Sequence, residues 1–447
     1  MKIILLLLAV KSTLFWMYVV QLKEYRFDRF RAEYGSVRTI VKFWISGGGR
    51  KLYAPVWTVK AILIFLVSSI PVIMLAAPAA YGSFSLSYYF FFYILAPLSV
   101  IVAVFLFGAP THFVRRHVHR LAEEKISRAR GLTVIGITGS YGKSSTKEFL
   151  SQLLSKKFKV AKTPGNVNTE IGIAQFVLKT LKPDDEIFIV EMGAYKPGEI
   201  QKICEMVKPK IGILTGISEQ HVALFGSFRA LQKAKYELID CLPADGLAVF
   251  NGENEYCVEL SKKWKGNKIM YRHAHDLRPD LPAHYGLNLG GAIEAAKYVG
   301  MTDREIEEAI GKIRLVERMM QGFAGRHGAW MINDTYSANP DGVFAAITYL
   351  SLQPHQNKIV VMPCLIELGD ASVGIHTKIG ELLHKNCDCA IITTPAYFKA
   401  IHDAAGDKAV LETNPEKVVE LLEQKINPET AVLLEGRLPE RIIQSLR

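Results

Sequence analysis

Hydrophobic and polar positions divide this chain into two parts with different periodicity. In the first part the apolar positions form long runs, at 3–22, 56–80 and 84–108. From Leu132 onward they form short β-branched runs, separated by segments in which apolar residues recur every three or four positions. The first pattern predicts long apolar helices. The second predicts strands that alternate with amphipathic helices.

The alternating part predicts an α/β fold with a doubly wound parallel sheet. The expected strands are TVIGIT, EIFIVEM, IGILTGI and GLAVFN, followed later by AWMIND, KIVVMP, CAIITT and TAVLLEG. Helical segments such as SSTKEFLSQLLSKKF and RALQKAKYELIDCL lie between them. The segment REIEEAIGKIRLVERMMQGFAG is the expected hinge. We therefore predict a central domain at 131–315 and a Rossmann-like C-terminal domain at 316–447.

The long apolar runs predict a membrane segment at 1–130. About 20 apolar residues cross the hydrocarbon core of a bilayer, so each run could form one span. A signal peptide is the alternative for 3–22, but this run is long and no small-residue cleavage site follows it. Basic residues cluster between the first two runs and after the third, which places those loops in the cytoplasm. This reasoning predicts a multi-pass protein of the inner (plasma) membrane, with the lipid bilayer as a partner and cytoplasmic catalytic domains.

The distribution of charge changes the interpretation of the basic composition. The net charge is +11, yet residues 1–130 contain 17 Lys and Arg against 5 Asp and Glu. The remaining residues contain 37 Lys and Arg against 38 Asp and Glu, so the alternating part is close to neutral. Nucleic acid is therefore not expected as a partner. The six cysteines show no CxxC pair and no disulfide framework.

One glycine-rich turn has the composition of a phosphate-binding loop. It lies in VIGITGSYGKSSTKEFL, at 134–150, between an expected strand and an expected helix. Gly139 and Gly142 allow a tight turn whose N–H groups face phosphate oxygens. Lys143 would reach the terminal phosphates, and Ser144 would bind Mg²⁺ at the helix N-terminus. The strict pattern G-x-x-x-x-G-K-[ST] fails at Ile137, so an ordinary strand–helix turn remains an alternative.

Further motifs follow this loop in order. They are TPGNVNTEIG (163–172), EMGAYKPGEI (191–200), GISEQHVALFGS (216–227), KAKYEL (233–238), AHYGLNLGGAIEAA (283–296), NDTYSANPDG (333–342) and LIELGDASVGIH (365–376). Together with the loop T-G-[ST]-x-G-K-[ST] at Thr138–Ser144, this set resembles the Mur ligases over residues 130–440. It is most similar to the branch that joins D-alanyl-D-alanine to a UDP-linked muramoyl tripeptide. Several motifs in one order are more specific than a single glycine loop.

The resemblance implies an ATP-dependent ligase that forms an amide bond in peptidoglycan synthesis. In this family an acceptor carboxylate attacks the γ-phosphate of ATP to give an acyl phosphate, which an amine then attacks. The implied partners are a muropeptide precursor and an amino acid or dipeptide, with D-alanyl-D-alanine the best candidate. The implied cofactors are ATP, two Mg²⁺ ions and a carbamylated lysine at Lys235.

The resemblance also implies roles for individual residues. Lys143, Lys235 and His221 would be catalytic. The metal ligands would be Ser144, Glu191, His221 and carbamylated Lys235. The nucleotide would contact Thr138, Gly139, Ser140, Gly142, Lys143, Ser144, Ser145, Asn288, Arg318, Asp334 and Asn339. The substrate would contact Thr163, Asn166, Asn168, Glu367 and His376. From the residues alone, Glu191 suits Mg²⁺ because it ends an apolar strand near the loop, whereas Lys235 would be a solvated lysine.

Four departures from the family pattern leave the substrates open. The membrane segment stands where the family has a UDP-sugar-binding domain. Asn333 and Ser337 replace an Asp and an Asn, VMPCLIELG lacks a Gly-Asp pair, and Glu435 stands where a Lys is usual. The alternatives are therefore a ligase for a lipid-linked precursor or polyglutamate, and an ATP-binding membrane module that no longer ligates. A membrane-proximal cell-wall synthesis partner could supply the missing grip on the acceptor.

Overall fold

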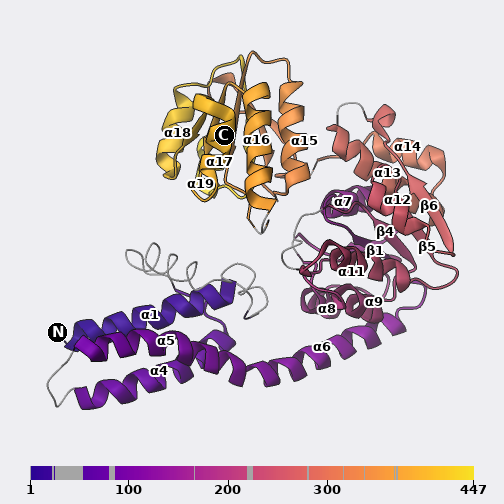
Figure 1. Ribbon diagram of the computed structural model, residues 1–447. Helices are drawn as coiled ribbons and strands as arrows, with labels where there is room; N and C mark the ends of the chain where they lie inside the picture. Colours follow the sequence, from indigo (N-terminus) through magenta and orange to yellow (C-terminus); the bar gives the residue numbers. More distant parts are fainter. Residues whose placement is uncertain are drawn as a thin grey trace. The chain divides into compact units, whose positions relative to one another are not determined.

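The computed structural model describes residues 2–22, 25, 54–79, 86–165, 167–218, 225–278, 281–315, 317–336, 338–366, 368 and 371–447 (Figure 1). The chain forms two compact units, Met1–Val118 and His119–Arg447. The first is helical and the second is α/β, as the change in periodicity predicts.

The first unit contains the helices α1 (Lys2–Leu22), α4 (Val59–Ala79), α5 (Leu86–Leu106) and the start of α6 (Gly108–Arg128). Apolar side chains from the first three helices pack together, among them Met17, Ile64 and Val100. Gln21 at the end of α1 forms two hydrogen bonds with the segment before α4. Its side-chain amide donates to the Val56 carbonyl at 2.8 Å and accepts from the Val56 N–H at 2.6 Å. Part of each apolar run thus forms a core between the helices, while other apolar side chains of the same runs, such as Leu66 and Phe105, are exposed.

The structure corrects the predicted localisation. Among the described residues, one helical stretch, Leu95–Arg128, is long and apolar enough to cross a membrane, and the apolar stretch at Val59–Pro71 is shorter. A three-span, multi-pass membrane protein is therefore the wrong prediction, and the bilayer as a partner loses its support with it. The apolar runs could not distinguish the two outcomes, because apolar composition alone does not show whether a helix crosses a bilayer: Met17 and Val100 are buried in the helical core, whereas Leu66 and Phe105 are exposed.

The second unit begins with a six-stranded parallel sheet. Its strands are β1 (Thr133–Thr138), β2 (Val160–Lys162), β3 (Ile187–Glu191), β4 (Ile211–Leu214), β5 (Leu247–Asn251) and β6 (Asn267–Tyr271). They lie in the order β2-β3-β1-β4-β5-β6. In the register Ile137 pairs with Glu191 and Thr138 with Leu214, so the carboxyl ends of β1, β3 and β4 meet at one edge. Ligands bind at this edge in doubly wound sheets.

Helices cover both faces of this sheet. They are α7 (Lys143–Leu154), α8 (Glu170–Lys179), α9 (Glu199–Val207), α11 (Phe228–Asp240), α12 (Glu255–Ser261), α13 (Ala283–Tyr298) and α14 (Asp303–Ile310). Ile135 and Ile137 share a core with residues of α7 and α13. On the other face, Gly136 and Gly212 leave room for Leu238 of α11 to approach the strands closely. Successive residues of β1 therefore face opposite sides of the sheet and pack against different helices on each side.

A second sheet follows in the C-terminal part of the unit. Its strands are β7 (Gln321–Ala324), β8 (Trp330–Asp334), β9 (Asn357–Met362), β10 (Cys389–Ile392), β11 (Ala409–Leu411) and β12 (Thr430–Glu435), in the order β11-β10-β9-β12-β8-β7. Its main helices are α15 (Pro340–Ser351), α16 (Ser372–Asn386), α17 (Phe398–Ala405), α18 (Pro415–Glu423) and α19 (Glu440–Ser445). All pairs are parallel except β7 with β8. The predicted α/β class is confirmed.

Candidate active site

The glycine loop turns between β1 and α7 at the shared strand edge. Gly139 has φ 153° and Gly142 has φ 76°, both in the region that favours glycine. A Cβ on Gly139 would lie 2.1 Å from the Thr215 hydroxyl oxygen, and one on Gly142 would lie 2.4 Å from Oδ1 of Asn288. Backbone conformation and space therefore both require glycine at these two positions.

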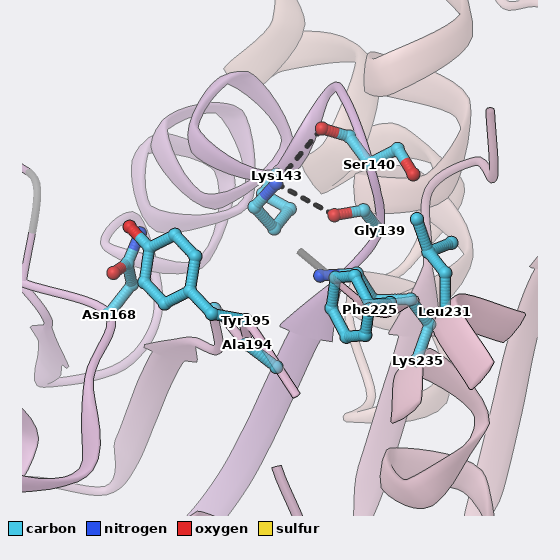
Figure 2. Close-up of a pocket in the computed structure, with 10 residues that line it drawn as sticks. Gly139, Ser140, Lys143, Asn168, Ala194, Tyr195, Phe225, Leu231 and Lys235 are labelled. Carbon is cyan, nitrogen blue, oxygen red and sulfur yellow. Dashed lines mark hydrogen bonds between the residues drawn. The ribbon is translucent and has the colours of Figure 1, made fainter. Parts of the chain in front are cut away.

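The side chain of Lys143 folds back into this loop. Its Nζ donates to the Gly139 carbonyl at 2.7 Å and to the Ser140 carbonyl at 3.2 Å (Figure 2). Burial lowers the pKa of Lys143, and the nearby Glu191 carboxylate opposes this effect. At the start of α7, Gly142 offers no side-chain cap. The first-turn N–H groups of α7 are thus oriented to receive an anion beside a lysine.

Glu191 ends β3 and is bound by several groups from other segments. Its Oε2 accepts from the Ser144 hydroxyl at 2.9 Å, and its Oε1 accepts from the Asn168 amide at 3.3 Å. The Glu191 N–H donates to the Thr163 hydroxyl at 3.0 Å. The structure thus brings together four of the residues that the sequence assigned to metal and substrate.

Lys147 is a further member of this cluster that the sequence analysis missed. It lies one turn after Lys143 on α7, is fully buried, and donates from Nζ to Glu191 Oε2 at 3.0 Å. Burial alone would raise the pKa of Glu191, but Lys147 and then Lys143 outweigh burial and lower it below its usual value. The four-residue spacing between the two lysines was the available signal, because it places both on one helix face.

Lys235 extends from α11 into a cavity of about 120 Å³ (Figure 2). The cavity is lined by Gly139, Ser140, Lys143, Asn168, Gly193, Ala194, Tyr195, Phe225, Leu231 and Lys235. Burial is the main cause that lowers the pKa of Lys235 to about 7, and the positive charge of Lys143 acts in the same direction. Its Nζ lies 5.8 Å from the centre of the Phe225 ring. Unlike a solvated lysine, Lys235 is in part a neutral amine near pH 7.

The remaining loop residues are held by backbone contacts. The Thr138 hydroxyl donates to the Met192 carbonyl at 2.9 Å, and the Ser140 N–H donates to the Gly216 carbonyl at 2.7 Å. Ser145 is buried in the first turn of α7. Three predicted site residues, Asn166, His221 and Glu367, lie outside the described residues.

The predicted site residues Arg318, Asn339 and His376 of the C-terminal domain each form hydrogen bonds with other groups of the protein. Arg318, with φ 68°, donates to Glu440 at 2.6 Å, and Asn339 caps α15 by accepting from the Gly342 N–H. His376 is fully buried: its Nε2 accepts from the Leu365 N–H at 2.9 Å, and its Nδ1–H donates to the Ser372 carbonyl at 2.6 Å. In this arrangement both ring nitrogens of His376 bind backbone groups.

Asp334 and Glu435 form a buried pair of carboxyl groups on neighbouring strands. They pair directly between β8 and β12. Burial raises the pKa of Asp334 to about 7 and raises that of Glu435 well above its ordinary value. Burial therefore favours the protonated form of both carboxyl groups. Among the described residues, neither side-chain oxygen of Glu435 has a hydrogen-bond partner.

The oxygen donors at the loop suit a magnesium ion that is also bound by phosphates. The Ser144 hydroxyl and the Glu191 carboxylate are hard oxygen ligands, and Mg²⁺ is commonly held by one or two protein ligands together with phosphates and water. Within the described part of the chain, no group of three or more His, Cys, Asp or Glu could hold a metal alone. The residues therefore fit an ion that shares its ligands between the protein and the phosphates of a nucleotide.

Comparison with known families finds two matching models. The Mur ligase middle domain matches residues 137–279, and the Mur ligase glutamate ligase domain matches residues 318–438. Together they account for more than half of the 447 residues. The first match contains the glycine loop, Glu191 and Lys235, and the second contains Asp334 and Asn339.

Several curated relatives are named UDP-N-acetylmuramoyl-tripeptide–D-alanyl-D-alanine ligase. The relative from Synechocystis is 28% identical over 268 residues, which cover 56% of this chain and 59% of the relative. The relative from Bacillus subtilis is 28% identical over 277 residues, which cover 57% of this chain and 60% of the relative. The chain thus matches less than two thirds of the length of these relatives.

Solved structures share the fold. MurF from Acinetobacter baumannii matches with a TM-score of 0.67 and 21% identity, over 74% of this chain and 80% of that one. The MurF ligase from Thermotoga maritima in complex with ADP matches with a TM-score of 0.66 and 24% identity, over 74% of this chain and 83% of that one.

Proposed function

This chain belongs to the Mur ligase family, and we propose that it is an ATP-dependent, ADP-forming ligase that joins D-alanyl-D-alanine to a UDP-N-acetylmuramoyl tripeptide. The name shared by the curated relatives supports this choice of substrates. It also makes lipid-linked precursors, polyglutamate and a non-ligating module the less favoured alternatives.

One observation carries the proposal, the convergence of Lys143, Glu191 and Lys235 from three different segments at one strand edge. The glycine loop and the uncapped start of α7 are suited to hold the phosphates of ATP. Glu191 and Ser144 are suited to hold Mg²⁺ against those phosphates. A site that only stored a nucleotide would not need a buried, partly neutral lysine beside the phosphate loop.

The chemistry requires charge stabilisation and exclusion of water. The acceptor carboxylate attacks the γ-phosphate, ADP leaves, and the amine then attacks the acyl carbon and releases phosphate. Lys143 would leave its two loop carbonyls and bind the terminal phosphate, where negative charge develops. Bound Mg²⁺ would add Lewis-acid stabilisation at the phosphates. Asn168 and Thr163 would hold the Glu191 segment in place beside the acceptor.

We further propose that Lys235 is carbamylated in the active enzyme. Only a neutral amine attacks CO₂, and the pKa of Lys235, lowered to about 7 by burial, provides that form near neutral pH. The carbamate carries a negative charge, so it would remove the repulsion between Lys235 and Lys143 and could act as a metal ligand. We expect Lys235→Ala to lose most activity and short-chain carboxylic acids to restore part of it, because they can fill the vacated position.

The direct test is a ligation assay on the full-length chain. The protein is incubated with ATP, Mg²⁺, the UDP-linked tripeptide and D-alanyl-D-alanine, while ADP release and product mass are measured. We expect product only when both substrates are present. Lys143→Ala should lower turnover roughly 10²–10³-fold, as the loss of one transition-state charge contact does elsewhere. ATP turnover that Lys143→Ala leaves unchanged, or the absence of an amide product with any muropeptide, would overturn the proposal.

A further inference from the structure

Four charged side chains form a continuous alternating row next to the phosphate loop. It runs from Glu191 through Lys147 and Glu148 to Lys162, and we refer to these four residues as the charge ladder. Lys147 lies 3.0 Å from Glu191 and 3.8 Å from Glu148, and Glu148 also pairs with Lys162. Of the two lysines in the ladder, Lys147 is fully buried and Lys162 is about one third exposed.

Within the ladder, Glu191 already has its charge balanced without a metal. Its Oε2 accepts from both Lys147 and Ser144, and Ser144 and Glu191 are the two residues proposed to bind Mg²⁺. Lys143, a second cation, also acts on Glu191. A buried carboxylate with such partners is well stabilised, because the ammonium groups replace the water that burial removes.

We propose that Lys147 is a positioning residue that keeps this site closed to free divalent cations, so that the metal enters together with ATP. The inference rests on the proposed function, since it assigns to Lys147 the control of metal entry at the proposed ligase site. Lys147 fixes the direction of the Glu191 carboxylate and acts as the resident counter-ion of the nucleotide-free protein.

The balance of charges explains why the nucleotide is needed. A divalent ion at Ser144 and Glu191 would add two positive charges beside a buried ammonium group that cannot move into solvent. While Lys235 is not carbamylated, the described residues at this point offer the ion one carboxylate and one hydroxyl, because Glu148 is already paired with Lys147 and Lys162. The phosphates of ATP bring several negative charges and further oxygen ligands. The same repulsion is then offset, and Mg²⁺ binds as part of the MgATP complex.

A manganese titration of the full-length, nucleotide-free protein tests this inference. Free Mn²⁺ is measured by its electron paramagnetic resonance signal, first without nucleotide and then with a non-hydrolysable ATP analogue. We expect wild-type protein to bind Mn²⁺ weakly alone and tightly with the analogue. Lys147→Met, which keeps the side-chain length without the charge, should bind Mn²⁺ alone at least about tenfold more tightly. Lys147→Arg should resemble wild type.

A matched control separates this effect from the loss of any lysine in an ion pair. Lys159 pairs with Asp184 at 2.9 Å, a distance similar to that between Lys147 and Glu191, but both partners are exposed. Lys159→Met should leave Mn²⁺ binding unchanged. Thermal melting supplies a second readout: without metal Lys147→Met should melt below wild type, and Mn²⁺ alone should raise its melting temperature more than that of wild type.

The outcomes distinguish this inference from the proposed function. Equal affinities of wild type and Lys147→Met for Mn²⁺ without nucleotide would overturn the role of Lys147, even if ligation is intact. Tight binding of Mn²⁺ by nucleotide-free wild type would overturn it as well. Failure of the wild-type protein to bind the ATP analogue would instead overturn the proposed function.

Discussion

Replacing Lys235 with methionine should make the protein more stable and inactive at the same time. Lys235 is 5% exposed, and burial lowers its pKa from 10.5 to about 7. In the unfolded chain the amine is fully protonated at pH 7, so folding must either bury a charge or release a proton. A pKa difference of this size corresponds to roughly 4 kcal/mol of lost stability at pH 7. Methionine has a similar length and carries no charge, so it avoids this cost.

The dependence on pH gives the sign of the effect. Between pH 7 and pH 10.5 the unfolded state binds more protons at Lys235 than the folded state does, so the wild-type protein gains stability as pH rises through this range. Lys235→Met lacks that gain. The stability difference between variant and wild type should therefore be largest at pH 7 and below, and should shrink toward pH 10.

The assay is thermal unfolding in CO₂-free buffer at several pH values, with ligation measured in parallel. For a domain of this size, about 1 kcal/mol corresponds to roughly 2–4 °C, so a rise of several degrees is expected for Lys235→Met at pH 7. Added bicarbonate should stabilise the wild type and not the variant, because CO₂ reacts with the folded, neutral amine. If the variant melts at or below the wild-type temperature at every pH, Lys235 is not held as a neutral amine and the reasoning fails.

Two further substitutions test the surroundings of the site. Gly142→Ala should weaken binding of an ATP analogue and lower the melting temperature, because φ is 76° and the new Cβ would lie 2.4 Å from Asn288 Oδ1; calorimetric titration with unchanged affinity would contradict the loop geometry. Glu435→Gln should stabilise the protein at pH 8 more than at pH 5, because the pKa of Glu435 is raised by burial and then by Asp334, and stability that depends on a raised carboxyl pKa is lost as pH rises. A stability difference that is the same at both pH values would show that Glu435 is not the titrating group.

The central strands could be predicted from the sequence because burial on both faces selects long β-branched runs. TVIGIT, EIFIVEM and IGILTGI correspond to β1, β3 and β4, and each is almost wholly buried. The edge strands gave no such signal. In β6, at one edge of the first sheet, three of the five residues are exposed, and β2 has three residues, all half-buried. A strand that packs on one side only needs few apolar residues, so its sequence resembles that of a loop.

The site was predictable where the backbone dictates the residue and less so where partners come from distant segments. Gly139 and Gly142 are required by local conformation, which a sequence motif reports directly. Lys147 resembles any polar residue of an amphipathic helix, because its partner Glu191 is 44 residues away. Likewise, the apolar runs before residue 110 carry the same signal for a helical core as for a bilayer, and this ambiguity produced the wrong localisation.

The start of α7 has a consequence for the local dynamics of the nucleotide-free protein. Gly142 gives this helix no side-chain cap, whereas α14 carries a complete capping box formed by Thr302 and Glu305. Bound phosphate would act as the missing cap of α7. Amide hydrogens in its first turn should therefore exchange rapidly with solvent deuterium until a nucleotide binds, while those at the start of α14 exchange at a rate independent of ligand. The phosphate loop would then be the part of this fold whose order is supplied by its substrate.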